Sequence, residues 1–573
     1  MLDLLIRGGT VVDGTGAPAH RGDVGVRDGR VVSDVDGESA TRTIDADGLV
    51  VAPGFVDLHT HYDAQLTWDP TASPSIFHGV TTVIGGNCGF TLAPAGPEHA
   101  DYLMRMMARV EGIPVDALST GLSWDWASYG DWLGRFDGAI AVNAGFLVGH
   151  CALRRSVMGP EAVEREAKDD EIAAMQQLLA EALQAGGLGF SSTQSNTHND
   201  ADGRPVPSRA ASGAELIALA GTVRDHPGTT LEFITAGCLS SFSEAEVGLM
   251  TGMSVAADRP LNWNLLGVSA ANPDFHVHQL AASDAAAARG GRIVALTLPH
   301  VMRIRLSFLT GFVLDGLPGW RETLHLPVPE RLRALSDPEV RARLKAGADS
   351  PEAGMLRGLA KWERLDLAET FAPETAAYTG RSIGDVAAER GIDPFDALLD
   401  IVVADELRTG LHPALPEGSD DDWKMRAEVW RDPRTIVGGS DAGAHLDMMC
   451  GAIYSTSLLG SAVRERQLLT LEEAVHQLTD VPARLYGLRD RGRIEANAHA
   501  DLVLFDPETV GHGPDRTRND LPGGAARLYA DATGIAHVIV NGVEVAANGV
   551  PTGAVPGTLL RSGRDTKTVT AAG

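Results

Sequence analysis

Eight short apolar runs constrain the fold of this 573-residue chain more than any other feature. Each run ends in polar or glycine residues, and helical stretches such as residues 169–186 lie between runs. Strands that alternate with amphipathic helices in this way are typical of a parallel sheet. The repeats therefore predict an α/β fold built on a closed (β/α)8 TIM-like barrel. The runs are residues 53–61, 79–89, 140–150, 186–195, 229–237, 261–269, 292–300 and 434–443.

Both ends of the chain have a different pattern, in which short alternating strands are separated by Gly and Asp-Gly turns. This pattern predicts that residues 1–52 and 485–573 together form a small β-sandwich domain. The barrel domain, residues 53–484, is then inserted into the sandwich.

The connection between the seventh and eighth runs is unusually long. Residues 306–409 exceed by far the about 2 to 6 residues of an ordinary βα connection. Much of this segment has a helical pattern, which predicts a helical insertion. It either covers the mouth of the barrel and shapes a substrate site, or serves as a surface elaboration or subunit contact.

The charge and cysteine content exclude several classes of partner. The chain has 48 basic and 76 acidic residues, a formal net charge of −28, and such a surface repels nucleic acid. No run of about 18 apolar residues without charge is present, so no membrane span is predicted. The four cysteines are scattered and the N-terminus has no signal-peptide pattern, which favours a cytoplasmic protein. Homo-oligomerisation is left open.

Two histidines stand one residue apart at the end of the first run. Side chains along a strand repeat every two residues, so His59 and His61 point to the same side. The carboxyl end of a barrel strand is also where such folds carry their chemistry. Two imidazoles in this position can share one divalent metal ion, and the alternative is a pair of solvated or hydrogen-bonded histidines.

Asp441 at the end of the eighth run is the most informative of the other polar groups at strand ends. A carboxylate beside a metal can bind the ion and also accept a proton from water that the metal activates. The alternative for Asp441 is a helix N-cap or turn residue. The other groups at or within run ends are Cys88, His150, Glu232 and His300.

The chain resembles the amidohydrolase superfamily, and within it the D-aminoacylase-like branch of N-acyl-D-amino-acid deacylases. The resemblance lies in the motifs GGTVVDGTG, DADGLVVAPGFVDLHTHYD, HGVTTVIGGNCGFTLAP, GSDAGAH and LTDVPARLYGLRDRGRIEANAHADLVLFDP. It implies a zinc-carrying barrel inserted into a β-sandwich. By motif match, His59, His61 and Cys88 would bind zinc, and Asp441 would be a ligand and the general base.

The chain departs from the family at its second metal site, which takes histidines from the ends of strands five and six. Here those runs contain Glu232 and Asn264 and no histidine. Three outcomes follow: a single zinc site, a site in which Glu232 replaces a histidine, or one that recruits His150. The predicted cofactor is therefore Zn2+, as one ion or two.

Several further residues are candidates for binding substrate. Arg154 follows the third run, and an arginine there can hold a substrate carboxylate through paired hydrogen bonds. His150, Glu111 and His300 complete this set. The stretch around His198 is interpreted as a solvated turn.

These observations support one function and leave two alternatives. The first is metal-dependent hydrolysis of the C–N amide bond of an N-acyl (D-)amino acid or a related small acyl amide, with Asp441 as base. The second is hydrolysis of a cyclic amide, although the fourth run lacks the lysine that the hydantoinase-like branch uses. The third is a barrel without catalysis that acts in binding or assembly.

Overall fold

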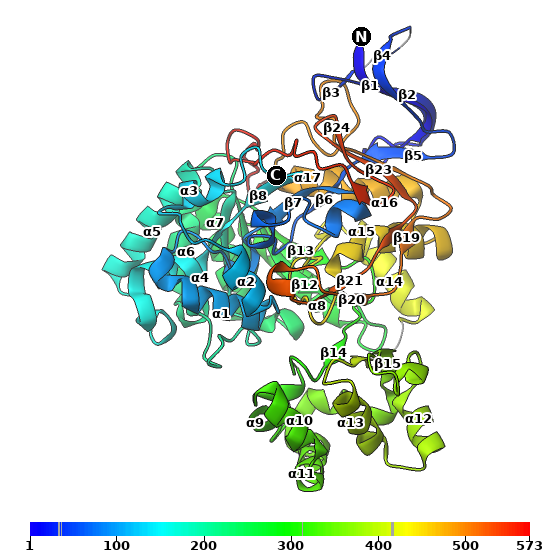
Figure 1. Cartoon of the computed structure of the whole chain (residues 1–573). Helices are drawn as coiled ribbons and strands as arrows, with labels where there is room; N and C mark the ends of the chain where they lie inside the picture. The colour runs from blue at the N-terminus through cyan, green and yellow to red at the C-terminus, as the bar shows by residue number, and fades with distance from the viewer. Residues whose placement is uncertain (33–34, 36, 312, 414–417, 573) are drawn as a thin grey trace.

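The computed structural model describes residues 1–32, 35, 37–311, 313–413 and 418–572. Helices surround the central parallel strands, and strands from both ends of the chain lie together at the top of Figure 1. A mostly helical lobe projects from the opposite side of the molecule (Figure 1).

Parallel strands follow one another in chain order, as in a TIM-barrel α/β fold. One group has the order β6-β7-β8 and the next β9-β10-β11-β12-β13-β17. A parallel bridge between Thr60 and Ala442 brings the segments after β6 and β17 side by side. The strands are β6 (Phe55–Asp57), β7 (Val80–Gly85), β8 (Asn143–Phe146), β9 (Val148–Gly149), β10 (Gly189–Thr193), β11 (Thr230–Ile234), β12 (Leu261–Leu266), β13 (Ile293–Thr297) and β17 (Thr435–Val437).

Amphipathic helices connect these strands, and their ends follow ordinary capping rules. In α7 (Glu244–Ala257) the Ser243 hydroxyl and the Glu246 carboxylate form a reciprocal capping box, and Asp258 ends the helix in a left-handed conformation. Apolar side chains of the helices pack onto the strands to form the main core. The other helices around the strands are α1 (Ala100–Val110), α2 (Val115–Gly121), α3 (Tyr129–Gly134), α4 (His150–Met158), α5 (Asp169–Gln184), α6 (Gly213–Val223), α8 (Phe275–Ala287), α14 (Asp420–Arg431), α15 (Tyr454–Ser457), α16 (Leu471–Leu478) and α17 (Asp480–Leu485).

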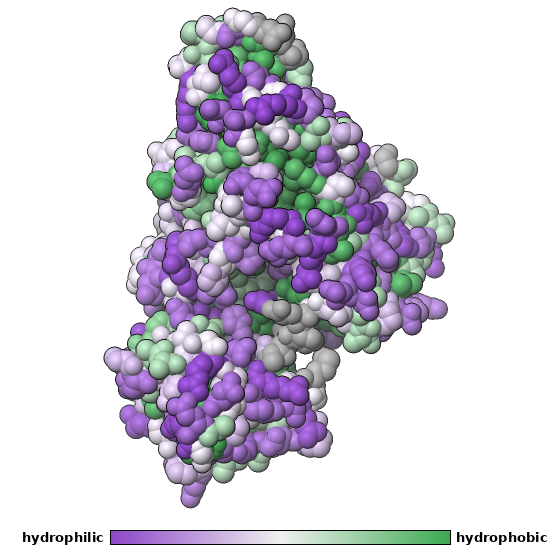
Figure 2. Space-filling model, turned by 90° about the vertical axis from the view of Figure 1, so that its right-hand side faces the viewer, coloured by the Kyte–Doolittle hydropathy of each residue, from purple (hydrophilic) through white to green (hydrophobic). Residues whose placement is uncertain are grey.

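The long connection after β13 forms a lobe with its own hydrophobic core. Trp320, Trp362 and Phe395 lie at its centre, and the Trp320 indole donates to the Leu344 carbonyl at 2.8 Å. Hydrophilic side chains cover much of the face of this lobe seen in Figure 2. Its elements are β14 (Leu306–Ser307), α9 (Arg321–Leu324), α10 (Val328–Ser336), α11 (Pro338–Asp349), β15 (Asp366–Glu369), α12 (Ile383–Arg390), α13 (Pro394–Ala404) and β16 (Gly410–His412).

Strands from both chain ends share one nine-stranded sheet. The antiparallel pair β5–β18 joins the two ends, because Val51 lies opposite Leu504. Within the described residues, no helix is both long and apolar enough to span a bilayer. The sheet contains β1 (Leu2–Val11), β2 (His20–Arg27), β3 (Arg30–Val32), β4 (Ala40–Asp45), β5 (Val50–Pro53), β18 (Leu502–Phe505), β23 (Ile535–Val540), β24 (Val543–Ala547) and β25 (Val550–Pro551).

Candidate metal centre

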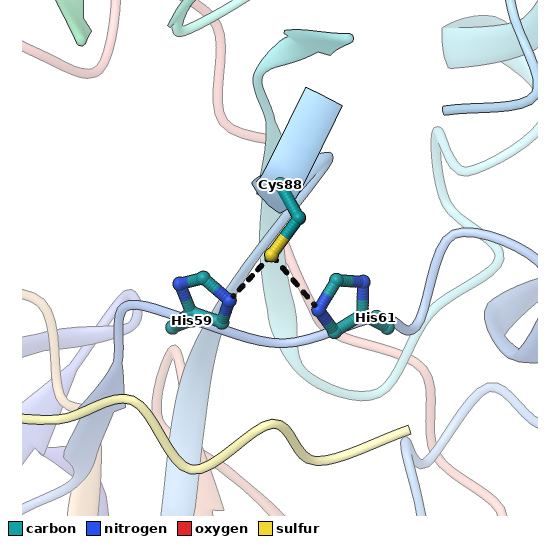
Figure 3. Close-up of side chains that lie close together, drawn as sticks. All are labelled: His59, His61 and Cys88. Atoms are coloured by element: carbon teal, nitrogen blue, oxygen red, sulfur yellow. Dashed lines mark hydrogen bonds between the residues drawn. The ribbon is translucent and has the colours of Figure 1, made fainter. Parts of the chain in front are cut away.

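Three buried side chains from two neighbouring strand ends point toward one another (Figure 3). His59 and His61 follow β6, and Cys88 lies in the turn after β7. The Cys88 Sγ atom is 3.2 Å from His59 Nε2 and 3.8 Å from His61 Nε2. Cys88 has a left-handed backbone with φ of 57°, and this turn directs its thiol at the imidazoles.

Asp441 brings a carboxylate to the same three groups from the segment after β17. Its Oδ1 atom lies 3.2 Å from His59 Nε2 and 3.5 Å from His61 Nε2. The backbone N–H of Asp441 donates to the His59 carbonyl at 3.1 Å, and Ser440 Oγ donates to Asp57 at 2.6 Å. These bonds fix the segment after β17 against the segment after β6, so all four groups predicted from strand ends converge.

Carboxylates gathered in this buried cluster make it favourable for a cation. The hydrogen bonds from the histidines outweigh burial and hold the pKa of Asp441 well below its usual range. Burial and the Glu232 carboxylate raise the pKa of the Cys88 thiol, which a bound metal ion would reverse. Two imidazole nitrogens, a sulfur and a carboxylate oxygen are a zinc donor set. The residues present therefore fit a zinc ion.

Glu111 lies behind one of the imidazoles. It directly follows α1, is 2% exposed, and its Oε1 atom is 3.5 Å from His61 Nδ1. Burial lowers the pKa of His61, but the Glu111 and Asp441 carboxylates outweigh this effect and raise it to about 9. A carboxylate in this place orients a ligating imidazole. The sequence predicted a substrate-binding role for Glu111, whereas the structure places it against His61.

Glu232 and Asn264 occupy the positions where the sequence departs from its family. Glu232 Oε2 accepts the Cys88 backbone N–H at 2.8 Å, and its Oε1 atom is buried without a hydrogen-bond partner in the structure. Burial raises the pKa of Glu232 to about 8. Asn264 Nδ2 lies within hydrogen-bond distance of His59 Nε2, at 2.8 Å. Glu232 thus contacts the backbone of the Cys88 turn through one carboxylate oxygen, and the other is available to a ligand.

The sequence matches a known protein family over most of its length. A profile of the amidohydrolase family matches residues 42–546. The chain belongs to the amidohydrolase family. It is 32% identical to an N-acyl-D-aspartate deacylase of Alcaligenes xylosoxydans xylosoxydans, over 98% of this chain and 95% of the relative.

Two solved structures place this amidohydrolase in the D-aminoacylase branch. It matches a D-aminoacylase structure with a TM-score of 0.64 and 28% identity, over 98% of this chain and all of that one. An N-acyl-D-glutamate deacylase from Bordetella bronchiseptica, solved with zinc and a phosphonate inhibitor, gives a TM-score of 0.64 and 26% identity, over the same shares. The enzyme is therefore a metal-dependent hydrolase of C–N amide bonds, and its α/β fold is of the TIM-barrel type.

His150 and Arg154 of this amidohydrolase form a buried network with Glu215. His150 Nε2 donates to Glu215 Oε1 at 2.8 Å, and its Nδ1 bonds Ser192 Oγ at 2.8 Å. Arg154 Nη1 donates to both Glu215 oxygens, at 2.6 and 2.5 Å. The remaining guanidinium donors bond the carbonyls of Ala162 and Arg165.

This network differs from the roles that the sequence suggested. Both ring nitrogens of His150 are bonded, so the structure does not bring His150 to the metal cluster as a ligand. Arg154 is fully buried and its donors are taken up by protein acceptors, which leaves none for a substrate carboxylate. Arg154 stabilises the packing of α4 against α6 instead.

His300, the last predicted substrate residue, also lies apart from the cluster. Its Nδ1 donates to the neighbouring Val301 carbonyl at 3.0 Å. Burial lowers the pKa of His300 to about 4, so the ring is neutral at physiological pH. The charged groups that influence it are His512 and Arg426 rather than the metal-cluster residues.

Two histidines near the cluster were missed as functional candidates. His445 affects the pKa of His59, Glu111 and Asp441, and its backbone N–H donates to the Glu111 carbonyl. It belongs to the motif GSDAGAH, so the sequence carried a signal for it.

The second is His198, in the stretch interpreted as a solvated turn. Its ring lies 5.2 Å from that of Phe90, burial lowers its pKa to about 3, and the neighbouring Asp200 is 1% exposed. The stretch does form turns with exposed residues such as Asn196 and Asp202, as expected, but His198 and Asp200 pack inward.

A cavity of about 720 Å³ adjoins the metal cluster. Gly112 and His445, which stand next to Glu111 and close to Asp441, are part of its lining. The rest of the wall comes from α1 and the residues just after it, from Ala201 and Asp447, from the lobe and from residues within 517–528. Its size suits a small organic substrate.

Proposed function

We propose that this amidohydrolase is a zinc-dependent N-acyl-D-amino-acid deacylase. The observation that carries the proposal is the convergence of His59, His61, Cys88 and Asp441 at one point next to a substrate-sized cavity. The aspartate and glutamate deacylases among its relatives support the substrate class. No observation favours the cyclic-amide or non-catalytic alternatives.

The four converging groups would hold one zinc ion, with Glu111 orienting His61 from behind. When bound, zinc supplies Lewis acidity that polarises an amide carbonyl and makes water acidic enough to lose a proton near neutral pH. Glu232 brings a further carboxylate to the Cys88 turn, and its unpartnered Oε1 atom makes it the candidate ligand if a second ion binds.

Asp441 is suited to act as the proton-transfer group. Its side chain is 21% exposed, whereas those of His59 and His61 are 0% and 1% exposed, so it faces the open side of the cluster. As a carboxylate beside the metal-binding side chains, it can accept a proton from the attacking water. Asp441 then returns this proton to the departing amine nitrogen, which completes hydrolysis to a carboxylic acid and a free amino acid.

The domain division is part of the proposal. The barrel would comprise residues 53–484 with the helical insertion at 306–409, and residues 1–52 and 485–573 would form the sandwich. Support comes from the sheet shared by both chain ends and from the separate core of the insertion. The cytoplasmic location stays a prediction, in keeping with four free cysteines.

A substrate panel tests the function. N-acetyl-D- and N-acetyl-L-amino acids are incubated with the zinc-loaded enzyme, and release of the free amine is measured. We expect turnover of D-substrates and a loss of at least about 100-fold in kcat for Asp441→Asn with zinc content retained. The matched control, Asp480→Asn, changes a buried aspartate of α17 that belongs neither to the four converging groups nor to the lining of the cavity. Full activity of Asp441→Asn would refute the role of this carboxylate.

A further inference from the structure

The base of the helical lobe forms one wall of the cavity. The chain enters the lobe at Arg305, directly before β14, and leaves it through β16, which follows shortly after Arg408. Antiparallel pairing of Leu306 with Leu411 and of Ser307 with Gly410 brings entry and exit together. Both arginines line the cavity, as does Phe371 of the lobe. We call this region, Arg305–Ser307 with Arg408–Leu411, the neck.

The lining of this cavity is strongly basic although the chain has a net charge of −28. Asp447 is the one acidic residue among the described residues that line it. Arg331 is 8% exposed and donates to the carbonyls of Phe308, Leu309 and Leu326 rather than to a carboxylate. Carbonyls do not neutralise a buried cation, so Arg331 adds positive potential to the wall. Arg105, Arg109, Arg305 and Arg527 are instead paired with carboxylates outside the lining, namely Asp202, Asp315, Glu369 and Asp520. The basic lining consists of Arg105, Arg109, Arg305, Arg331, Arg408 and Arg527.

Arg408 is the neck residue best placed to touch a ligand. Its side chain is 45% exposed, and its guanidinium lies 4.9 Å from the centre of the Phe371 ring. Nε donates to the Asp405 carbonyl at 3.3 Å, and Nη2 lies 3.7 Å from the Glu406 carboxylate. The ring and the carbonyl orient the guanidinium, while its loose ion pair leaves donors available for a second carboxylate.

Arg305, the other arginine of the neck, lines the same cavity. It is 4% exposed, and Nη2 contacts Glu369 at 2.8 Å and Thr517 at 3.0 Å. Its Nη1 atom is buried without a hydrogen-bond partner in the structure. Arg305 therefore adds positive potential to the neck that its one carboxylate partner offsets in part.

The neck lies away from the reacting atoms. None of His59, His61, Cys88 and Asp441 is among the described residues that line the cavity, which meets the centre at His445 and Gly112. A group bound at the neck therefore lies outside the ring of metal-binding side chains. We propose that Arg408 binds the side-chain carboxylate of an N-acyl amino acid with an acidic side chain, and that this contact sets the specificity of the enzyme. This inference rests on the proposed deacylase function.

The test compares N-acetyl-D-glutamate with its neutral isostere N-acetyl-D-glutamine. We expect the wild type to prefer glutamate, and Arg408→Gln to lower kcat/KM for glutamate by about 10- to 100-fold with little change for glutamine. Arg381→Gln is the matched control, because Arg381 also lies over an aromatic ring and pairs with a glutamate, but it does not line the cavity. An equal loss on both substrates, or none on glutamate, would overturn the proposal.

A further substrate, N-succinyl-D-alanine, carries its second carboxylate on the acyl group. An Arg408→Gln loss on this substrate and not on N-acetyl-D-glutamate would place the bound carboxylate on the acyl side and refute the side-chain assignment. If the wild type hydrolyses none of these compounds, the deacylase function fails. Calorimetric binding of N-acetyl-D-glutamate and N-acetyl-D-glutamine then decides separately whether Arg408 selects a carboxylate, since only Arg408→Gln should abolish the preference.

Discussion

An Arg154→Met substitution removes the cation from a fully buried ion pair. Glu215 then keeps its bond from His150 but loses both contacts with the guanidinium, and the carbonyls of Ala162 and Arg165 lose their donors. Breaking a buried pair in this way costs about 3–5 kcal/mol in the free energy of unfolding. The energy is lost because a carboxylate stays buried without its main partner.

Urea unfolding followed by circular dichroism at pH 7 measures this loss, and enzyme kinetics on the same samples measure KM. The double variant Arg154→Met with Glu215→Leu leaves no buried carboxylate, so it should be destabilised less than Arg154→Met alone. KM should stay near the wild-type value in both. An unchanged unfolding midpoint together with a tenfold higher KM would refute this account and restore a substrate-binding role for Arg154.

Three further predictions concern other parts of the molecule. Glu111→Gln should lower the affinity for zinc by about 10- to 100-fold in a chelator competition. Glu98→Gln, at an exposed glutamate, is the control, and equal zinc affinities of the two variants would exclude an orienting role for Glu111. Burial lowers the pKa of His78 to about 4, so the unfolded chain takes up a proton at pH values where the folded chain does not. The contribution of His78 to the free energy of unfolding should therefore be fully present above about pH 6.5 and fall by about 3 kcal/mol toward pH 4. His78→Gln should flatten the dependence of the free energy of unfolding on pH. Parallel pH curves for the wild type and this variant would contradict the assignment to His78. Trp320→Ala should destabilise the lobe by about 3–5 kcal/mol. Limited proteolysis should then cut faster within residues 306–412, at unchanged zinc content. Loss of zinc would show that the lobe is not independent of the metal cluster.

The metal cluster was predictable because its residues stand at the ends of parallel strands. The two-residue spacing of His59 and His61 and the position of Asp441 after the eighth run fix which edge of the sheet they share. The structure brings these groups together with Cys88, so a local pattern was sufficient here.

Contacts between distant elements were not predictable from local pattern. Arg154 precedes a charged stretch and resembled a substrate residue, yet its partner Glu215 lies on another helix, 61 residues away. The neck depends on pairing between β14 and β16, which no motif marks. Glu111 was predicted to bind substrate, whereas its contact with His61 depends on how α1 packs over the strand ends, which no local pattern marks.

Metal content per chain, measured by plasma mass spectrometry alongside turnover of N-acetyl-D-glutamate, tests the central claim most directly. The proteins are the wild type, His61→Ala and Cys88→Ala, with Cys151→Ala as a matched control because Cys151 is also buried but lies outside the cluster. We expect about one zinc ion per chain in the wild type and in Cys151→Ala. His61→Ala and Cys88→Ala should lose zinc and turnover together. Full turnover in a wild-type enzyme stripped of metal, or full zinc content in both ligand variants, would contradict the central claim.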